Sequence, residues 1–190
     1  MPAVVFDLGN VLVPWVPHRV ISAACIEETE FFRWNADLDG GAPFAETVAA
    51  VRAAFPQWGD ELDAFRDRWP ETLGDPAPDV VAIVEELRAA GVGLYVLSNS
   101  SAETVPRSAP VSELLTRFDG VMLSGEFGVL KPDPAIFHEA EGRFGLNPLE
   151  TWFVDDSAAN VEGARAVGWN AHHFVDAPSL RAALSAAGVL

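Results

Sequence analysis

Acidic side chains stand directly after short apolar runs at two points of this sequence. Asp7 follows Ala3-Val4-Val5-Phe6, and Asp155 and Asp156 follow the run over 152–154. A carboxylate at the end of a buried strand can act as a nucleophile, as a metal ligand or as both. Asp7 alone is weak evidence, because Asp close to Gly is also common in turns. The acidic pair makes the chemistry more specific, since clustered carboxylates repel one another unless a cation holds them.

The three carboxylates form an oxygen-donor set if their strands are neighbours. Mg²⁺ is the hard cation that a few carboxylates, water and a substrate phosphate bind together. Zinc is not expected, because the sequence has one cysteine, Cys25, and the adjacent His172 and His173 lack the spacing of a zinc site. Mg²⁺ is therefore the predicted cofactor.

Three further segments carry polar groups that could lie near these carboxylates. Ser98 and Asn99 end the apolar run over 92–97, and Ser124 ends a shorter one. Lys131 lies between a Gly-bounded loop and Pro132, just ahead of a helix-like segment. A stiff turn of this kind holds an ammonium group in place, as catalysis requires.

From residue 76 onward, strand-like runs alternate with helix-like segments. Strands are predicted over 92–97, 121–123, 152–154 and 171–175, and helices over 78–90, 134–144, 160–167 and 178–187. Such alternation is typical of a parallel sheet covered by helices on both faces, which is an α/β fold. Because parallel strands end at one edge of a sheet, their terminal polar side chains converge on one crevice.

Residues 16–75 have a different character. They hold few strand-like runs and many helix formers, at 19–27, 44–55 and 59–69, and residues 36–43 are predicted as a turn or loop. We interpret them as a small helical domain inserted after the first strand. The remaining residues, 1–15 and 76–190, then form the sheet-containing core.

These segments resemble, in their order, the four motifs of the haloacid dehalogenase (HAD) superfamily. The matching residues are Asp7-Leu8-Gly9-Asn10-Val11, Ser98-Asn99, Lys131-Pro132-Asp133-Pro134, and Asp155-Asp156 with Asn160. The insert over 16–75 stands where that family has its C1-type cap, so the resemblance covers essentially the whole chain. It implies the HAD fold, a three-layer Rossmann-like parallel sheet with a helical cap. The first motif is most similar to the branch that includes bacterial α-D-glucose-1-phosphate phosphatase.

The resemblance implies a nucleophile and a metal site. Asp7 would attack phosphorus and form an aspartyl-phosphate. Mg²⁺ would be held by Asp7, by the backbone carbonyl of Gly9 and by Asp156, with Asp155 close by. The doublet leaves open which of Asp155 and Asp156 binds the metal directly.

It also implies groups that bind the transferring phosphoryl. Ser98, through its hydroxyl, and Asn99, through its side chain or backbone, would contact the phosphoryl oxygens. Lys131 would neutralise charge on the phosphate and on Asp7. Asn160 would orient Lys131 or the carboxylates; the alternative is that it caps the start of its helix.

One position departs from the family pattern. Many phosphatases of the superfamily carry a second Asp two residues after the nucleophile, where it protonates the leaving alcohol, and this sequence has Gly9 there. General acid–base catalysis is typically worth about 10²–10⁴-fold, so its loss should affect alkyl phosphates most. His18, Glu46 or a bound water could replace the acid, and His18 is the best of these because it follows the first strand closely and because histidine side chains titrate near neutrality.

Composition limits the partners. A net charge of −16 disfavours nucleic acid and anionic membranes, since both attract basic surfaces. No apolar run reaches the roughly 18 residues that span a bilayer, and no signal peptide is recognisable. One cysteine fits a cytoplasmic location. Five arginines of the insert are candidates for binding a second anionic group of a substrate: Arg19, Arg33, Arg52, Arg66 and Arg68. The oligomeric state is open.

Three functions remain in competition. The first is an Mg²⁺-dependent phosphatase for a small phosphorylated metabolite, with a sugar phosphate as one candidate. The second is a 2-haloacid dehalogenase, in which Asp7 attacks carbon; dehalogenases also lack the second Asp, but they use no metal. The third is a HAD-fold protein that has lost turnover and binds a partner.

Overall fold

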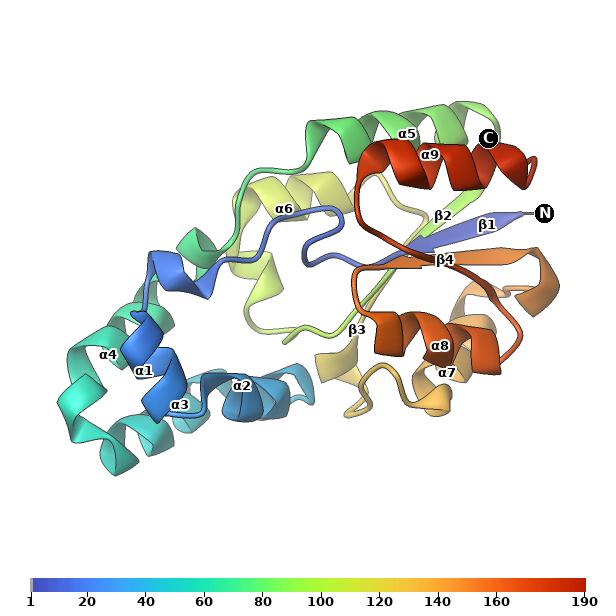
Figure 1. Cartoon of the computed structure of the whole chain (residues 1–190). Coiled ribbons are helices and arrows are strands. Elements are labelled where there is room, and N and C mark those ends of the chain that lie inside the picture. The colour runs from blue at the N-terminus through green and yellow to red at the C-terminus, as the bar shows by residue number, and fades with distance from the viewer. Residues whose placement is uncertain (1) are drawn as a thin grey trace.

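A single parallel sheet forms the centre of the chain. The computed structural model describes residues 2–190. Over these residues, the sheet has five strands in the order β3-β2-β1-β4-β5, and every strand pair is parallel (Figure 1). The strands are β1 Ala3–Phe6, β2 Gly93–Ser98, β3 Gly120–Leu123, β4 Thr151–Asp155 and β5 Asn170–His173. The predicted α/β fold is confirmed.

The register of the central strand explains why the polar residues meet. β1 lies between β2 and β4, and Phe6 pairs with Val96 on one side and Val154 on the other. Asp7 follows immediately, and its backbone N–H donates to the carbonyl of Val154 at 2.8 Å. One step along each strand, Asp7 and Asp155 therefore leave the sheet at the same edge.

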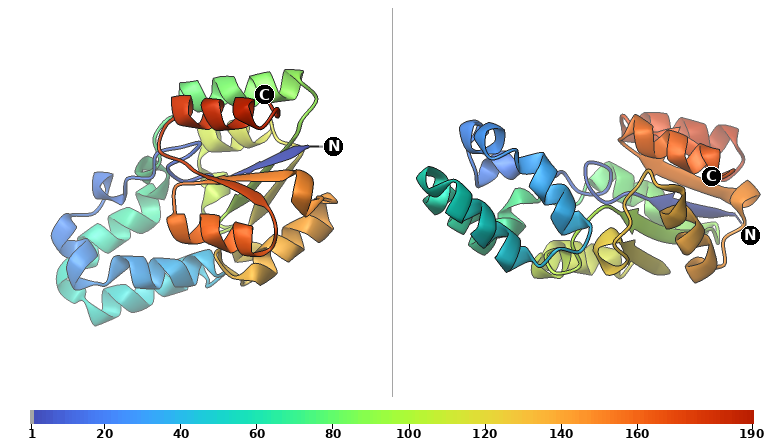
Figure 2. Two further views of the ribbon diagram at one scale, coloured as in Figure 1. Left: turned by 45° about the vertical axis from the view of Figure 1, so that its right-hand side comes forward. Right: turned by 90° about the horizontal axis from the view of Figure 1, so that it is seen from below.

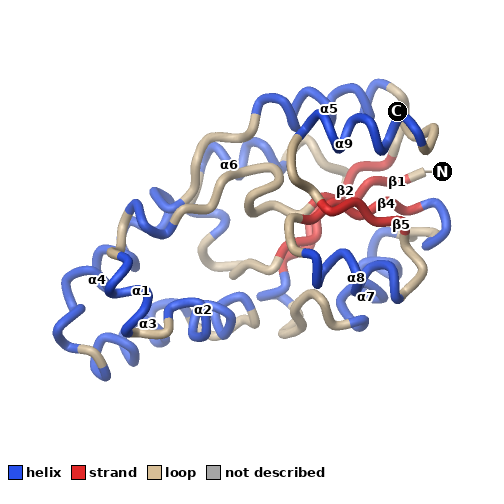
Figure 3. Tube along the Cα trace, viewed as in Figure 1, coloured by secondary structure: helices blue, strands red, loops and turns tan. Residues whose placement is uncertain are grey.

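Helices cover both faces of the sheet, giving the three layers seen in Figures 2 and 3. On one face lie α5 (Pro78–Ala89), α6 (Ala109–Leu115) and α9 (Ala177–Ala186); on the other lie α7 (Pro134–Phe144) and α8 (Ala158–Ala166). Val4 and Phe6 pack with the first group, whereas Val5 packs with the second. Successive strand residues point to opposite faces, so the apolar run of β1 is buried on both.

A helical insert follows β1, as predicted. It contains α1 (Ala23–Glu28), α2 (Phe31–Asp39), α3 (Phe44–Ala54) and α4 (Gly59–Arg68), and it lies beyond the carboxyl ends of the strands (Figure 1). Its own core is aromatic: the Phe31 ring packs edge-on against those of Trp34 and Phe65, with centroids 4.9 and 5.3 Å apart. The boundaries at residues 16 and 75 stay a prediction.

Two chain segments, residues 12–15 and 73–77, connect the insert to the sheet, and they run antiparallel and hydrogen-bond to each other. Gly74 N–H donates to the carbonyl of Pro14 at 2.8 Å, and Ala77 N–H donates to that of Leu12 at 2.9 Å. Trp15 and Leu73 form an antiparallel bridge between the same segments. The insert is thus tied to the core beside the first-strand loop that carries Asp7.

The prediction of a loop over residues 36–43 was wrong in its first half. Helix α2 continues to Asp39, because Phe31, Trp34 and Leu38 have helical spacing and form a buried face. Gly40 and Gly41 then end the helix, and Gly41 has a φ of 93°, which favours glycine. Asp39 is therefore the last residue of a helix.

No helix among residues 2–190 is long and apolar enough to cross a membrane.

Candidate active site

A buried lysine joins two of the predicted carboxylates. The Lys131 ammonium lies 2.8 Å from Oδ1 of Asp7 and 2.7 Å from Oδ2 of Asp155, and it donates to the carbonyl of Leu97 at 2.9 Å. Its side chain is fully buried, and it is the only lysine in the sequence. An ammonium group has three donors, so these contacts use all of them. Lys131 therefore holds Asp7 and Asp155 at a fixed separation.

The loop that carries Lys131 is fixed through Asn99. The Asn99 side-chain amide donates to the Lys131 carbonyl at 2.9 Å, and its oxygen accepts from the Lys131 N–H at 2.8 Å. Both ends of the amide are thereby engaged with the lysine backbone. The sequence had left open whether Asn99 would contact a phosphoryl group through its side chain or through its backbone. Because the side chain is engaged, the backbone is the group that remains available.

The acidic doublet divides into two environments. Asp155 is fully buried and accepts hydrogen bonds from Lys131, from the Ser157 N–H at 2.8 Å, and from Asn160 Nδ2 at 3.0 and 3.1 Å. Asp156 is not buried, and its Oδ2 accepts only from Asn10 Nδ2, at 3.2 Å, among the side chains of residues 2–190. Asp155 is thus saturated by donors, whereas Asp156 has acceptor capacity left.

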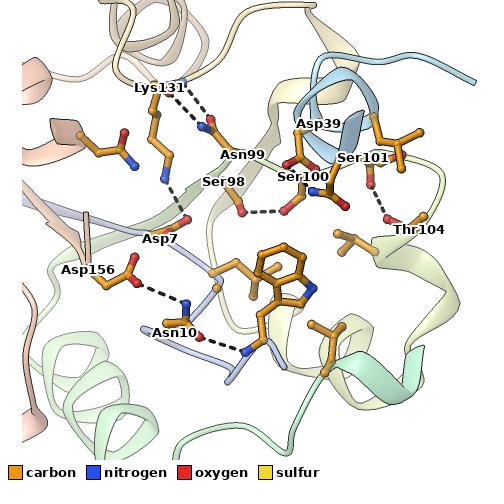
Figure 4. A pocket seen from close by; sticks show the side chains of 18 of the residues that line it. Asp7, Asn10, Asp39, Ser98, Asn99, Ser100, Ser101, Thr104, Lys131 and Asp156 are labelled. Carbon is orange, nitrogen blue, oxygen red and sulfur yellow. Dashed lines mark hydrogen bonds and ion pairs between the residues drawn. The ribbon is translucent and has the colours of Figure 1, made fainter. Parts of the chain in front are cut away.

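Asn10 supports Asp156 from the first-strand loop. It has a φ of 57°, in the left-handed region that Asn tolerates better than most residues. Its Oδ1 accepts from the Trp15 N–H at 3.0 Å while its amide reaches Asp156 (Figure 4). The loop after β1 and the loop after β4 are therefore connected.

The donor set fits a hard divalent cation. One oxygen from each of Asp7, Asp155 and Asp156 can be chosen so that all three lie within 4.8 Å of one another. The carbonyl of Gly9 accepts no hydrogen bond from any residue over 2–190. Asp7, Asp156 and the Gly9 carbonyl therefore offer free oxygens, and such oxygens suit Mg²⁺.

Burial and charge shift the acid–base properties of the pair. Burial raises the pKa of Asp7 to about 6; Lys131 opposes that shift and Asp155 adds to it. Burial by itself would lower the pKa of Lys131, but Asp7 and Asp155 outweigh it and hold this pKa above its usual value. Lys131 stays cationic at neutral pH, and Asp7 is mainly ionised there.

A cavity of about 250 Å³ opens between the sheet edge and the insert. Its floor includes Asp7, Ser98, Asn99 and Lys131, all predicted site residues (Figure 4). The Ser98 hydroxyl lies 2.8 Å from that of Ser100. The structure thus brings the first three predicted motifs to one cavity, and Asp156 and Asn160 of the fourth also line it.

Two residues suggested as a replacement acid do not reach this cavity. His18 is exposed in a short turn before α1, Glu46 is exposed on α3, and neither lines the cavity. The acidic residue that the insert does place there is Asp39. Nothing in the residue pattern pointed to Asp39, because an Asp before Gly-Gly is typical of a turn.

None of the five arginines of the insert that were candidates for binding a second anionic group lines the cavity. Arg19 donates to the carbonyl of Leu73, and the others pair with acidic neighbours on the surface, as Arg33 does with Glu30 and Arg68 with Glu71. Lys131 is the single Lys or Arg among the described residues that line the cavity.

Comparisons with known proteins agree with this geometry. A family model described as a hydrolase, haloacid dehalogenase-like hydrolase, matches residues 1–168. Phosphatase MT3486 of Mycobacterium tuberculosis is 34% identical over 186 residues, which cover 90% of this chain and 85% of that protein. The (S)-2-haloacid dehalogenase 4A of Burkholderia cepacia is 33% identical over 93 residues, 49% of this chain. The chain matches 40% of that dehalogenase.

A solved structure shows the same fold. The HAD family enzyme bt-2542 of Bacteroides thetaiotaomicron, in complex with magnesium and inorganic phosphate, superposes with a TM-score of 0.68. The two sequences are 22% identical, and the match covers 90% of this chain and 93% of that one.

Proposed function

Because the chain belongs to the haloacid dehalogenase-like hydrolases, we propose that it is an Mg²⁺-dependent phosphatase acting on a small phosphorylated metabolite through an aspartyl-phosphate on Asp7. The charge balance of the site carries this proposal. Three carboxylates face one ammonium group, and two of the carboxylates are buried. An excess of buried negative charge is costly unless a cation neutralises it. The magnesium and phosphate bound by the bt-2542 enzyme support the same assignment.

Each site residue has a distinct part in the proposed reaction. Asp7 attacks phosphorus, and Lys131 neutralises charge on the phosphoryl group. The Ser98 hydroxyl and the Asn99 backbone bind phosphoryl oxygens. Asn160 holds Asp155, which in turn fixes the ammonium of Lys131.

The metal would be held by the oxygens that the protein leaves free. These are Asp7, Asp156 and the carbonyl of Gly9, so Asp156 is the direct ligand of the doublet and Asp155 acts through Lys131. When bound, Mg²⁺ would stabilise the charge of the transferring phosphoryl group.

The cavity favours a neutral leaving group. With Lys131 engaged at Asp7 and no arginine on the described cavity wall, nothing cationic remains for a second anionic group. The wall away from Asp7 combines the apolar side chains of Trp15, Leu38 and Trp69 with hydroxyl and amide groups. An uncharged polyol such as a sugar fits this lining. We therefore propose a sugar phosphate as the substrate.

Haloacid dehalogenation is the second candidate, since the Burkholderia cepacia dehalogenase is similar in sequence to about half of this chain. It needs no cation beside Asp7, and the free carboxylate of Asp156 disfavours it for that reason. The same purified protein can decide between the two.

The deciding experiment measures two products. Inorganic phosphate is followed with acetyl phosphate and p-nitrophenyl phosphate, and chloride with 2-chloropropionate, each in Mg²⁺ and in EDTA. We expect phosphate release that requires Mg²⁺ and is abolished by Asp7→Asn. An Asp37→Asn variant, changed at an exposed position of α2, should behave as the unmodified protein. Metal-independent chloride release would contradict the proposal.

A further inference from the structure

Asp39 occupies the side of the cavity that faces away from the sheet. It is the last residue of α2 and lines the same cavity as Asp7 and Ser98. In the view of Figure 4, Ser98 and Ser100 lie between Asp39 and Asp7. In phosphoryl transfer the attacking and leaving oxygens are roughly in line, so a leaving group departs on the side opposite to Asp7. In this cavity, that is the side of the helical insert.

The end of α2 is fixed against the core. The Ser124 hydroxyl donates to the carbonyl of Asp39 at 2.5 Å and accepts from the Ser100 N–H at 3.0 Å. A Cβ atom at Gly41 would lie 2.7 Å from the carbonyl oxygen of Gly125, so the two backbones touch. This contact positions Asp39 relative to the loop that follows Ser98.

The Asp39 carboxylate lies against the loop that follows Ser98. It accepts from the Ser101 N–H and from Asn35 Nδ2, the latter at 3.0 Å. No cation pairs with it among the described residues. A carboxyl group with no cationic partner, facing a cavity, retains the capacity to exchange a proton there.

We propose that Asp39 is the general acid and base of the reaction, in place of the group that Gly9 does not provide. The inference rests on the proposed phosphatase activity. In the first step the carboxyl proton of Asp39 moves to the leaving oxygen as the bond from that oxygen to phosphorus breaks and Asp7 bonds to phosphorus. In the second step a water oxygen bonds to phosphorus and its proton moves to the Asp39 carboxylate. The Asp7–phosphate bond breaks, and both residues return to their starting forms.

The environment of Asp39 matches that role. Burial raises its pKa to about 7, the hydrogen bonds from Ser101 and Asn35 oppose the shift, and the charges of Asp7 and Lys131 act in opposite directions. A pKa near the operating pH serves both proton donation and proton removal. Two other acidic residues lie on the neighbouring segments: Glu103 accepts from the Phe44 N–H, and Glu126 pairs with a surface arginine.

The test compares two leaving groups in Asp39→Asn. β-Glycerol phosphate expels an alkoxide that needs a proton, whereas p-nitrophenyl phosphate expels a stable phenolate. We expect kcat/KM for the alkyl ester to fall about 10²–10⁴-fold and that for the aryl ester to fall less than about tenfold. Because water activation is also lost, kcat for the aryl ester should fall after a burst of one p-nitrophenol per active site. Asp37→Asn is the matched control.

Each other outcome has a defined meaning. Equal losses of kcat/KM with both esters would assign Asp39 a structural role and overturn the inference. Unchanged aryl-ester kcat without a burst would overturn its role as base. A second measurement needs no variant: in the unmodified protein, kcat/KM for β-glycerol phosphate should decline above about pH 7 while that for the aryl ester does not. Matching profiles would refute Asp39 as the acid, and no turnover of either ester would refute the proposed function itself.

Discussion

Replacing Asp39 by Asn should change how the stability of the protein depends on pH. The folded protein holds the Asp39 proton up to about pH 7, whereas a carboxyl group in the unfolded chain has a pKa of 3.8. Between these values the folded state binds a proton that the unfolded state does not. The resulting stability is fully present below pH 3.8 and is lost as the pH rises through about 7.

The size of this effect follows from the pKa difference. Each pH unit inside the window changes the free energy of unfolding by about 1.4 kcal/mol per proton. From about pH 5 to about pH 8 the titration covers roughly two units, which gives an upper value of about 2.7 kcal/mol. Asp39 is only partly buried and solvent screens its charge, so we expect between about 1 and 2.5 kcal/mol. Asn at this position does not titrate, and its altered hydrogen bonds contribute an offset that is independent of pH.

Urea denaturation at the two pH values measures the difference directly. The free energy of unfolding of Asp39→Asn, minus that of the unmodified protein, should increase by the stated amount between about pH 5 and about pH 8. Asp37→Asn on the same helix is exposed and should show no comparable trend. A difference for Asp39→Asn that is flat with pH would refute the reasoning, since it would mean that Asp39 titrates alike in both states.

Three further predictions follow from the same contacts. Lys131→Met should abolish phosphatase activity and lower the free energy of unfolding by about 3–5 kcal/mol, because it leaves the buried carboxylates of Asp7 and Asp155 without a cation; a loss below about 1 kcal/mol in urea would contradict this. As the single lysine, Lys131 should give one side-chain ammonium signal in an NMR titration, with a pKa above the usual lysine value; a lowered pKa would mean that burial outweighs the carboxylates. Gly9→Asp, introduced where a Cβ meets nothing within 4 Å, should restore alkyl phosphate hydrolysis to Asp39→Asn; the absence of recovery would show that proton transfer was not the lost function.

The sheet edge could be predicted because its geometry is local. A short apolar run that ends in a carboxylate specifies both a strand and the position of the side chain at its end. The order of the runs then specifies an α/β sheet, and the register of Phe6 with Val96 and Val154 brings Asp7 beside the ends of β2 and β4. Which residue of the doublet is saturated by hydrogen-bond donors and which keeps free acceptor oxygens was not predictable. The difference between Asp155 and Asp156 depends on which of the two side chains Lys131 and Asn160 contact.

The insert was harder to interpret for a physical reason. Its helices bury their faces against one another and against the sheet edge, so what enters the cavity depends on helix length and docking. The sequence suggested a turn over 36–43, and a turn would have placed Asp39 at an arbitrary position. The extra helical turn, driven by Trp34 and Leu38, is what carries Asp39 to the cavity.

This difference bears on how a proton donor should be sought in chains with an Asp-Leu-Gly-Asn segment. Gly9 removes the carboxyl group from the loop that carries Asp7, but in the proposed reaction the leaving group still departs toward the insert. A substitute acid must therefore come from a segment that docks against the Ser98–Ser101 loop. Here that segment is the end of α2, where the Ser124 hydroxyl and the Gly41–Gly125 contact fix the backbone. Proximity in sequence to Asp7, which favoured His18, is a poor guide, because the chain leaves the cavity after Trp15 and returns to it at Asn35, Leu38 and Asp39.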